Sequence, residues 1–346
     1  MESLREQAPD SRIEAGMNGF GRFGKYLLKY WLERDQEAEF TIGYINDIGL
    51  SCEQAREVLV NDPYLGEFFS ERIISADGGN LVCRSESGNE YAVHFTSQDD
   101  KNIDWVGQPS MFFECSGANT RGQDNRKFLR GETRLVLISA TSLDSDAILI
   151  YGHNHTELSE QHKIVSYGSC TVNAYVPLAK FIDRSFGVED SSCHVIHSVP
   201  DQRIDAFQEP RRQDCTLQEV APALLSFASE NNFMVTYTLA PFSGVSMIDF
   251  RFRLREAAEE EKVVCILSEA INGGALQGLY GLAEFDQGPD RYKFTPYSAV
   301  LTKSGIKMRS DTLYIQAYLD NENSANRFYD LSQYAAQKLN SPEAKK

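Results

Sequence analysis

The sequence predicts a two-domain α/β protein, with a parallel, doubly wound sheet first and an α+β domain with a mainly antiparallel sheet after it. Three observations lead to this prediction. The chain has 346 residues, and a chain of this length usually folds into two domains, each with its own core. Residues 12–140 alternate short β-rich runs with helical ones, the pattern of a parallel sheet. After residue 170 the strand-like runs are longer, and residues 251–255 alternate charged and apolar side chains as a strand with one wet face does.

The first elements form a β–α–β unit. Residues 12–24 give a short alternating strand and a glycine-rich turn, residues 25–35 carry apolar side chains at helical spacing, and residues 40–47 are a β-branched and aromatic run. Further strands are expected at 111–117 and 134–140. Short strands separated by helices are typical of a parallel sheet, so we expect these strands to pair side by side.

The second half combines longer strands with helices. The expected strands are 192–199, 232–240, 245–254 and 310–319, and the expected helices are 216–230, 256–271 and a closing helix at 321–339. We assign residues 1–169, together with the C-terminal helix at 321–346, to one domain. Residues 170–320 then form the second domain.

Composition narrows the possible partners. The net charge of −16 argues against nucleic acid and anionic membrane surfaces, which carry the same sign, but it does not exclude small anionic ligands. Seven cysteines without a C-x-x-C pair, and no secretory signal, indicate free thiols in a reducing compartment. No apolar run approaches the length of a membrane span. We therefore expect a cytoplasmic protein with no nucleic-acid or membrane partner.

The glycine-rich turn has the spacing of a dinucleotide-binding loop. Gly19, Gly21 and Gly24 follow the G-x-G-x-x-G pattern, which allows a tight turn, close approach of a pyrophosphate and close packing of the following helix. The phosphates would lie at the positive N-terminal end of that helix. We expect the whole turn to bind the cofactor, including Phe20, Arg22 and Phe23. The alternative interpretation is a plain β–α turn.

Asp47 follows the next strand, 23 residues past Gly24. A carboxylate at this position can accept hydrogen bonds from a ribose diol and would repel a 2′-phosphate. This favours a Rossmann domain that binds NAD rather than NADP. The alternative is an aspartate that only caps the turn.

Cys170 stands in "KIVSYGSCTVNAYVPLAKF", between a β-rich run and a helix that begins with small polar residues. A thiol at a helix N-terminus has a lowered pKa, and the free N–H groups and hydroxyls there can stabilise an oxyanion. The alternative is a buried cysteine that only fills space, which is the usual role of a free cysteine.

Two histidines in residues 192–199 can complete a cysteine–histidine pair, which would support covalent catalysis. Because side chains alternate along a strand, His194 and His197 lie on opposite faces, and at most one of them faces Cys170. Sequence spacing alone does not choose between the two.

With these motifs in view, the chain resembles the phosphorylating glyceraldehyde-3-phosphate dehydrogenase family from about residue 13 to residue 338. The segments that carry the resemblance occur in the family's order and at close to its spacings: "NGFGRFGK", "YIND", "SGANT" after "FFE", "LISATS", "KIVSYGSCTVNAYVPLAK", "LAPFSGVSMIDFRFRL" and "LDNENSANR". The S-C-T-x-N motif at the start of a helix, after a Rossmann half, is highly specific.

The resemblance implies a role for each of several residues. The family's catalytic histidine follows its cysteine by 27 residues, as His197 follows Cys170, so His197 becomes the base and His194 an ordinary strand residue. Asn321 matches the asparagine that fixes the nicotinamide, and Ser139 in "LISATS" falls at the cofactor site. The family's phosphate-binding hydroxyls correspond to Ser169, Thr171 and Thr216.

The implied reaction is NAD-dependent oxidation of a small aldehyde, glyceraldehyde 3-phosphate or a related one. The aldehyde would form a thiohemiacetal and then a thioester on Cys170, and inorganic phosphate would release the product as an acyl phosphate. No metal is implied. The family also implies a homo-oligomer, a dimer or a tetramer.

The chain departs from the family where the substrate phosphate should bind. Leu239 replaces an arginine, Val199 or Pro200 replaces a threonine, and Leu217 replaces a glycine. Within the cysteine motif, Val172 and Ala174 replace a threonine and a cysteine. The loop after His197 is shorter than in the family, which leaves the oligomeric state open.

These departures leave alternatives. Arg203, Arg211 and Arg212 in the shortened loop could supply the missing guanidinium, or they could be solvated or interface charges. The chain could be a divergent paralogue that acts on a different, unphosphorylated aldehyde, with water or another acyl acceptor. It could also be a non-catalytic NAD-binding regulatory protein.

Overall fold

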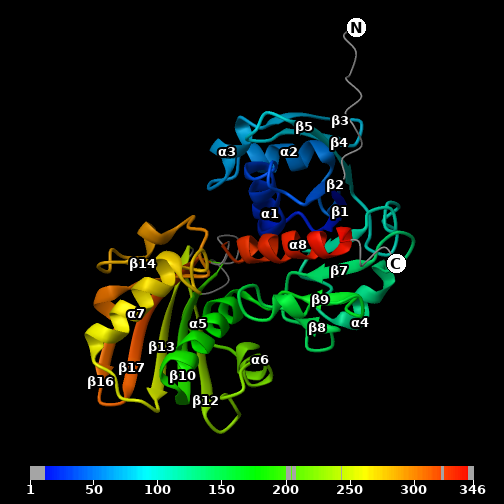
Figure 1. Cartoon of the computed structure of the whole chain (residues 1–346). Coiled ribbons are helices and arrows are strands. Elements are labelled where there is room, and N and C mark those ends of the chain that lie inside the picture. The colour runs from blue at the N-terminus through cyan, green and yellow to red at the C-terminus, as the bar shows by residue number, and fades with distance from the viewer. Residues whose placement is uncertain (1–11, 200–203, 205–207, 243, 321–322, 342–346) are drawn as a thin grey trace.

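The computed structural model describes residues 12–199, 204, 208–242, 244–320 and 323–341. Its strands form two sheets, one mostly from the N-terminal half of the chain and one from the C-terminal half (Figure 1). The predicted architecture, a Rossmann-type parallel sheet followed by a mainly antiparallel α+β domain, is confirmed.

The first sheet runs in the order β3-β4-β5-β2-β1-β6-β7-β9-β8. From β5 to β8 every neighbouring pair is parallel. Its strands are β1 (Ile13–Asn18), β2 (Phe40–Asn46), β3 (Ile73–Asp77), β4 (Asn80–Arg84), β5 (Glu90–Thr96), β6 (Met111–Glu114), β7 (Leu135–Ile138), β8 (Ala147–Ile148) and β9 (Ile164–Ser166).

One edge of this sheet differs from the prediction. Strands β3, β4 and β5 form an antiparallel meander that the sequence interpretation did not include. The first of its turns contains Gly78 and Gly79, both with positive φ, which is the backbone that a two-residue hairpin requires. The Asp-Gly-Gly sequence was therefore an available hairpin signal.

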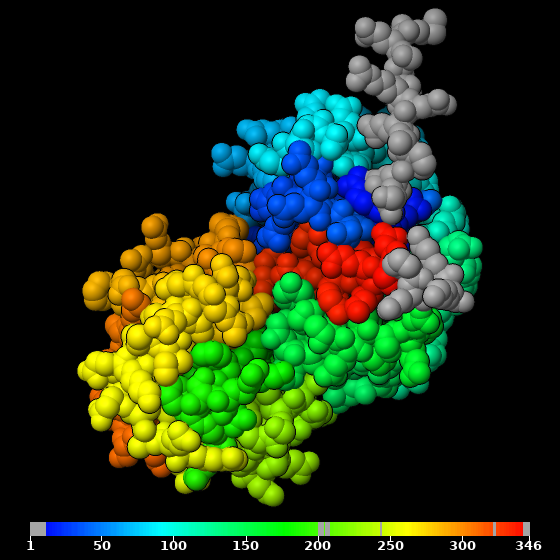
Figure 2. Space-filling view, viewed as in Figure 1, coloured from blue at the N-terminus to red at the C-terminus, as the bar shows by residue number. Residues whose placement is uncertain are grey.

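Helices cover the first sheet and complete its core. They are α1 (Arg22–Glu33), α2 (Cys52–Val60), α3 (Gly66–Ser70), α4 (Gly122–Asn125), the 3-10 turns η1 (Arg126–Phe128) and η2 (His155–Glu157), and α8 (Ser324–Asn340). The C-terminal helix α8 lies against the N-terminal segment, red beside blue in Figure 2. Its Phe328 is buried in the same core as Leu27 of α1.

The second sheet runs in the order β11-β12-β10-β13-β17-β15-β14, with β16 paired to β17. Most of its pairs are antiparallel, while β10–β12 and β14–β15 are parallel. Its strands are β10 (Val188–Ser198), β11 (Arg211–Arg212), β12 (Phe233–Ala240), β13 (Val245–Leu254), β14 (Tyr280–Ala283), β15 (Ala299–Thr302), β16 (Lys307–Arg309) and β17 (Thr312–Asp320).

The helices of the second half are α5 (Cys170–Phe186), α6 (Leu217–Leu224) and α7 (Glu260–Gly273), with 3-10 turns η4 (Pro289–Tyr292) and η5 (Lys303–Gly305). Helix α6 is shorter than the predicted helix at 216–230. It contains Pro222, which lacks a backbone donor, and it ends two residues later. Helices α5 and α7 share a core with the sheet, and both lie in front of it in Figure 1.

The two cores divide the chain between two units. The core of the first sheet draws on residues up to Tyr167 and on α8, whereas the core of the second sheet extends from Val172 to Leu319 and also includes Ile150 and helix α5. On this basis we propose a boundary between Ser169 and Cys170, with the C-terminal helix in the first domain. Among the described residues, no helix combines the length and apolar character needed to cross a bilayer.

Candidate active site

Cys170 is the first residue of α5, directly after the turn that follows β9. Gly168 makes this turn with φ of 86°, and a side chain there would come within 2.7 Å of Ile150. Ser169 caps the helix, and its Oγ accepts a hydrogen bond of 3.3 Å from the backbone N–H of Val172. The turn therefore places a half-buried thiol at the positive end of a 17-residue helix.

The other six thiols of the chain have surroundings that disfavour a thiolate. Burial raises the pKa of most of them, and a neighbouring carboxylate raises the pKa of the exposed one; they are Cys52, Cys83, Cys115, Cys193, Cys215 and Cys265. In Cys52 the pKa rises to about 11 and in Cys83 to about 12. These six cysteines are therefore poor nucleophiles at neutral pH.

His197 lies beside the sulfur of Cys170. Its Nε2 is 3.5 Å from the Sγ of Cys170, and its Nδ1 is 2.7 Å from the backbone carbonyl of Ser198. A carbonyl oxygen only accepts hydrogen bonds, so Nδ1 carries the proton of the neutral ring. The Nε2 lone pair is then directed at the thiol, which is the geometry of a base beside its nucleophile.

Burial determines the charge of this imidazole. It lowers the pKa of His197 to about 4, and the positive charge of Arg22 acts in the same direction, while the bond to the Ser198 carbonyl opposes them. At neutral pH the ring is therefore uncharged and can accept a proton. The effect of Arg22, the first residue of α1, indicates that the glycine-rich turn lies within electrostatic reach of His197.

The end of β10 holds the imidazole in place. The backbone N–H of Ser198 donates to the Oγ of Ser246 at 2.9 Å, and the Oγ of Ser198 donates to the carbonyl of Gly244 at 2.6 Å. His194 lies on the same strand, but it is exposed and is paired in register with Asp249 of β13. It is therefore not brought to Cys170.

Tyr237 belongs to the site and was missed in the sequence. Its ring centroid lies 5.2 Å from that of His197, with 33° between the ring planes. Burial raises the pKa of the Tyr237 hydroxyl, and the charge of Cys170 adds to the effect, so the phenol stays protonated. Tyr237 lies two residues before Leu239 on β12 and so on the same strand face, which was a usable signal once Leu239 had been singled out.

The three predicted phosphate-binding hydroxyls occupy different environments around Cys170. The hydroxyls of Ser169 and Thr171 are 3.1 Å apart at the helix start, and the Thr171 side chain is buried. Thr171 Oγ1 also contacts the Sγ of Cys215 at 3.6 Å. The neighbouring Thr216 is exposed, and its Oγ1 donates to the hydroxyl of Thr141 in the first domain at 3.1 Å.

The glycine-rich turn fits a dinucleotide phosphate. Gly19 has φ of 95°, and a Cβ there would lie 2.3 Å from the backbone of Ser116. Gly21 is exposed, with open space where its side chain would be, and α1 begins after it without a side-chain cap and without an acidic residue in its first turn. The first N–H groups of the helix, which have no acceptor within it, can therefore hold an anion.

Two aromatic residues of the turn face inward. The ring of Phe20 contacts Phe95 at 5.6 Å, and the ring of Phe23 contacts Tyr167 at 5.7 Å. Their side chains belong to the core, so any contribution of Phe20 and Phe23 to cofactor binding comes from the backbone. The contact with Tyr167 again brings the turn close to Cys170.

Asp47 fixes the glycine-rich turn from the end of β2. Its Oδ2 accepts a hydrogen bond of 2.7 Å from the backbone N–H of Phe20, and its Oδ1 accepts one of 2.9 Å from Gly49. A carboxylate can accept about four hydrogen bonds, so capacity for a ribose diol remains. The turn-capping interpretation and the ribose-binding interpretation are thus compatible.

Of the two remaining predicted cofactor residues, only Ser139 is among the described residues. Ser139 directly follows β7, where its backbone N–H donates to the carbonyl of Glu114 at 2.9 Å. Asn321 lies outside the described residues, next to the end of β17. Among the residues with described positions, no group of three or more His, Cys, Asp or Glu side chains could hold a metal ion.

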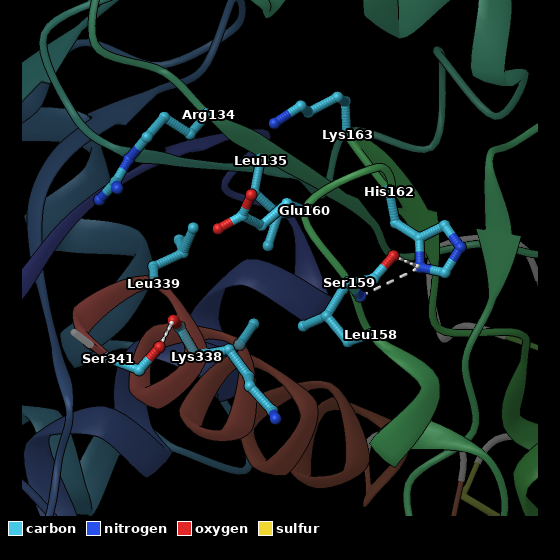
Figure 3. A pocket seen from close by; sticks show the side chains of 11 residues that line it. Arg134, Leu135, Leu158, Ser159, Glu160, His162, Lys163, Lys338, Leu339 and Ser341 are labelled. Atoms are coloured by element: carbon cyan, nitrogen blue, oxygen red, sulfur yellow. Dashed lines mark hydrogen bonds between the residues drawn. The ribbon is translucent and has the colours of Figure 1, made fainter. Parts of the chain in front are cut away.

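A cleft of about 410 Å³ lies elsewhere on the first domain (Figure 3). Arg134, Glu160 and Lys163 line one side of it, and Lys338 of α8 lines the other. None of the predicted site residues borders this cleft, and it contains no cysteine. It is therefore separate from the site around Cys170.

Comparison with known proteins agrees with this geometry. Residues 169–321 match the family model for "Glyceraldehyde 3-phosphate dehydrogenase, C-terminal domain". The chain is 26% identical over 337 residues to the glyceraldehyde-3-phosphate dehydrogenase of Sclerotinia sclerotiorum, a match that covers 93% of this chain and 96% of that protein.

Two further relatives show the same breadth. Glyceraldehyde-3-phosphate dehydrogenase 1 of Bacillus subtilis (strain 168) is 25% identical over 342 residues, which covers 94% of this chain and 99% of that protein. The cytosolic enzyme of Pisum sativum is 25% identical over 351 residues, with coverage of 95% and 99%. The resemblance predicted from the motifs is confirmed.

Proposed function

We propose that this chain, which is similar to glyceraldehyde-3-phosphate dehydrogenases over most of its length, is an NAD-dependent aldehyde dehydrogenase that works through a thioester on Cys170. The observation that carries the proposal is the 3.5 Å approach of His197 Nε2 to Cys170 Sγ. A neutral imidazole with its lone pair on a thiol at a helix start is the arrangement that covalent catalysis at an aldehyde requires.

In the first step the sulfur of Cys170 attacks the aldehyde carbon. The S–C bond forms while the C=O π electrons move to oxygen, and His197 takes the thiol proton at Nε2. The same nitrogen returns the proton to the oxygen, which yields a thiohemiacetal. The N–H groups at the start of α5 are placed to stabilise the negative charge that develops on this oxygen.

The oxidation needs a hydride acceptor, and NAD, when bound, would supply it. The glycine-rich turn, Asp47, Ser139 and Asn321 are the residues proposed to hold it, with the pyrophosphate at the N-terminal end of α1. His197 removes the hydroxyl proton as the C–H electron pair leaves. The carbonyl re-forms, and a thioester remains on Cys170.

Inorganic phosphate is the proposed acyl acceptor. One phosphate oxygen attacks the thioester carbonyl, the C–S bond breaks, and the proton held by His197 returns to the sulfur. The product is an acyl phosphate. Ser169, Thr171 and Thr216 are proposed to bind the phosphate, and the hydroxyls of the first two lie 3.1 Å apart beside Cys170.

One observation favours a second candidate with the same chemistry. Leu239 of β12 is paired with His197 of β10, so an apolar side chain lies beside the proposed substrate site. The aldehyde could therefore differ from glyceraldehyde 3-phosphate, and the acceptor could be water. For the non-catalytic alternative we find no supporting observation. The partners remain a small aldehyde, phosphate and, as a prediction, further copies of the chain.

The test of this proposal is NADH production from a panel of aldehydes, with and without inorganic phosphate. The proposal expects turnover with at least one small aldehyde and faster turnover when phosphate is present. Turnover that ignores phosphate would favour a different acceptor. If the protein binds NAD but forms no NADH with any aldehyde in the panel, the proposed activity is contradicted.

Replacing Asp47 with asparagine is expected to weaken NAD binding about tenfold, because a charged hydrogen-bond acceptor for the ribose is lost. Asparagine can still accept the Phe20 N–H through its side-chain oxygen, so the bond to the glycine-rich turn is kept, while the bond from the Gly49 N–H is lost. Binding of NADP should weaken less, since the repulsion of a 2′-phosphate also disappears. Calorimetry with both dinucleotides measures the two effects.

The matched control is Asp77→Asn, which removes an exposed carboxylate at the β3–β4 turn and should leave both affinities unchanged. Equal affinities for NAD and NADP in the unmodified protein would remove Asp47 from its assigned role.

The pKa of His197 leads to an expected pH dependence. Because burial lowers it to about 4, the acid limb of kcat/KM assigned to this base should lie near pH 4 instead of near 6.5.

The free energy of unfolding should also depend on pH through His197. In the unfolded chain the imidazole binds a proton as the pH falls through 6.5, whereas in the folded protein it does so only near pH 4. The contribution of His197 to the free energy of unfolding is therefore complete above pH 6.5 and is lost as the pH falls from 6.5 to 4.

Rates and urea unfolding at pH 7 and pH 5 measure both parts of this expectation. The His197→Asn variant should lose less stability between the two pH values than the unmodified protein. If kcat/KM of the unmodified protein fell near pH 6.5, and His197→Asn moved that fall, the pKa of His197 would be the ordinary one. This result would contradict the expectation.

A further inference from the structure

We propose that Arg211 binds the anionic end of the aldehyde, and that it does so from a strand adjacent to Leu239. This inference rests on the proposed function, because it assigns a binding partner to a substrate of Cys170. Three steps lead to it: the strand register, the face of the sheet that points at the site, and the chemistry of the side chains on that face.

The register sets three residues in one row across the sheet. His197 of β10 is paired with Leu239 of β12 in a parallel ladder. Leu239 is in turn paired with Arg211 of β11 in an antiparallel ladder. Neighbouring strands are about 4.8 Å apart, so the Cα of Arg211 lies about 10 Å from that of His197 along this row.

The face of this row is fixed by Tyr237. It lies two residues before Leu239, so both side chains project from the same side of β12. Because the ring of Tyr237 lies 5.2 Å from the ring of His197, that side is the one that faces Cys170. Leu239 therefore points into the site.

Residues directly opposite each other in an antiparallel pair project from the same face, with Cβ atoms about 5 Å apart. Arg211 therefore shares the face of Leu239 and His197. Arg212 is paired with Thr238 and projects from the opposite face. The two adjacent arginines, which sequence reasoning left open, are thus distinguished by the register.

The row provides a cation from the strand next to β12. Leu239 offers no donor to an anion, and the next residue along the row is a guanidinium on a flexible three-methylene stem. A guanidinium binds phosphate or carboxylate through two parallel hydrogen bonds. We therefore infer a substrate with an aldehyde at one end and an anionic group a few bonds away, with the anion at Arg211.

The experiment compares kcat/KM for glyceraldehyde 3-phosphate and for glyceraldehyde. The variants are Arg211→Ala, Arg211→Lys and the matched control Arg212→Ala. Loss of a charge-assisted pair should lower kcat/KM for the phosphorylated aldehyde about 10- to 100-fold, through KM. Glyceraldehyde should be unaffected, Arg211→Lys should be intermediate, and Arg212→Ala should resemble the unmodified protein. The same comparison with a neutral four-carbon aldehyde and its carboxylated counterpart shows whether Arg211 acts on a carboxylate as well as on a phosphate.

A second variant tests the row itself. Leu239→Arg in the Arg211→Ala background restores a guanidinium one strand closer to His197 and should recover part of the lost kcat/KM. Equal losses in Arg211→Ala and Arg212→Ala would overturn the proposal, as would equal losses on both aldehydes. Lys293→Ala is a further variant, because Lys293 lies beside Gly244. A loss in Lys293→Ala and none in Arg211→Ala would place the anion there and overturn the proposal.

Binding of glycerol 3-phosphate, measured by calorimetry against glycerol, separates this inference from the proposed function. If no aldehyde is oxidised but binding still depends on Arg211 and not on Arg212, the activity is wrong and the anion site stands. If aldehydes are oxidised and neither binding nor KM responds to Arg211, the anion site is wrong and the activity stands.

Discussion

Cys170→Ser is expected to lower kcat at least about 1000-fold, because the hydroxyl is a far weaker nucleophile and its oxygen ester a poor substitute for a thioester. The substitution changes one atom at the start of α5, so the fold and NAD binding should be preserved. NADH production gives the rate, and calorimetry with NAD shows that the cofactor site is intact. The loss should be the same for every aldehyde that the unmodified protein oxidises.

The matched control is Cys215→Ser. This second thiol is half-buried and contacts Thr171 next to Cys170, but its pKa is raised and, among the described residues, it forms no hydrogen bond with a histidine. We expect its replacement to change kcat less than about threefold, as for an ordinary site near but outside the chemistry. Comparable losses in the two variants would mean that Cys170 is not the nucleophile.

His197→Asn is expected to lower kcat/KM about 100- to 10,000-fold, the usual contribution of a positioned general base. The base acts twice in the proposed sequence, on the thiol proton and on the thiohemiacetal hydroxyl. In the unmodified protein we expect iodoacetamide to alkylate Cys170 faster than the other six cysteines. The variant should lose both this fast alkylation and the oxidation step. Peptide mapping after brief labelling and stopped-flow NADH formation measure the two separately.

His194→Asn is the control, since this histidine lies on the opposite face of β10 and is exposed. Its kinetics should match those of the unmodified protein. If alkylation of Cys170 stayed fast in His197→Asn, the helix end alone would activate the thiol, and the role of His197 would be limited to the oxidation step.

The parts of the site that are local in sequence could be predicted from the sequence. The glycine spacing, the strand before it and the helix after it specify the turn, and Gly19 has the positive φ that this turn requires. Cys170 at a helix start follows from the small polar residues around it. The parallel sheet follows from the alternation of strands and helices.

The parts that depend on pairing between distant strands could not be predicted. Alternation showed only that His194 and His197 face opposite ways, and the choice between them came from family resemblance. Tyr237 and Arg211 reach the site through the ladders β10–β12 and β11–β12, which pair residues 26 to 42 positions apart in the chain. The antiparallel meander at β3–β5 was missed, although its glycine turn was visible.

The most direct test of the central claim is the mass of the protein after incubation with an oxidised aldehyde and NAD in the absence of phosphate. A covalent thioester predicts an increase equal to the acyl group, located by peptide mapping on Cys170 and removed when phosphate is added. The same increase should be missing from Cys170→Ser. Steady NADH formation by a protein that never carries an acyl group, under conditions that preserve thioesters, would contradict the claim.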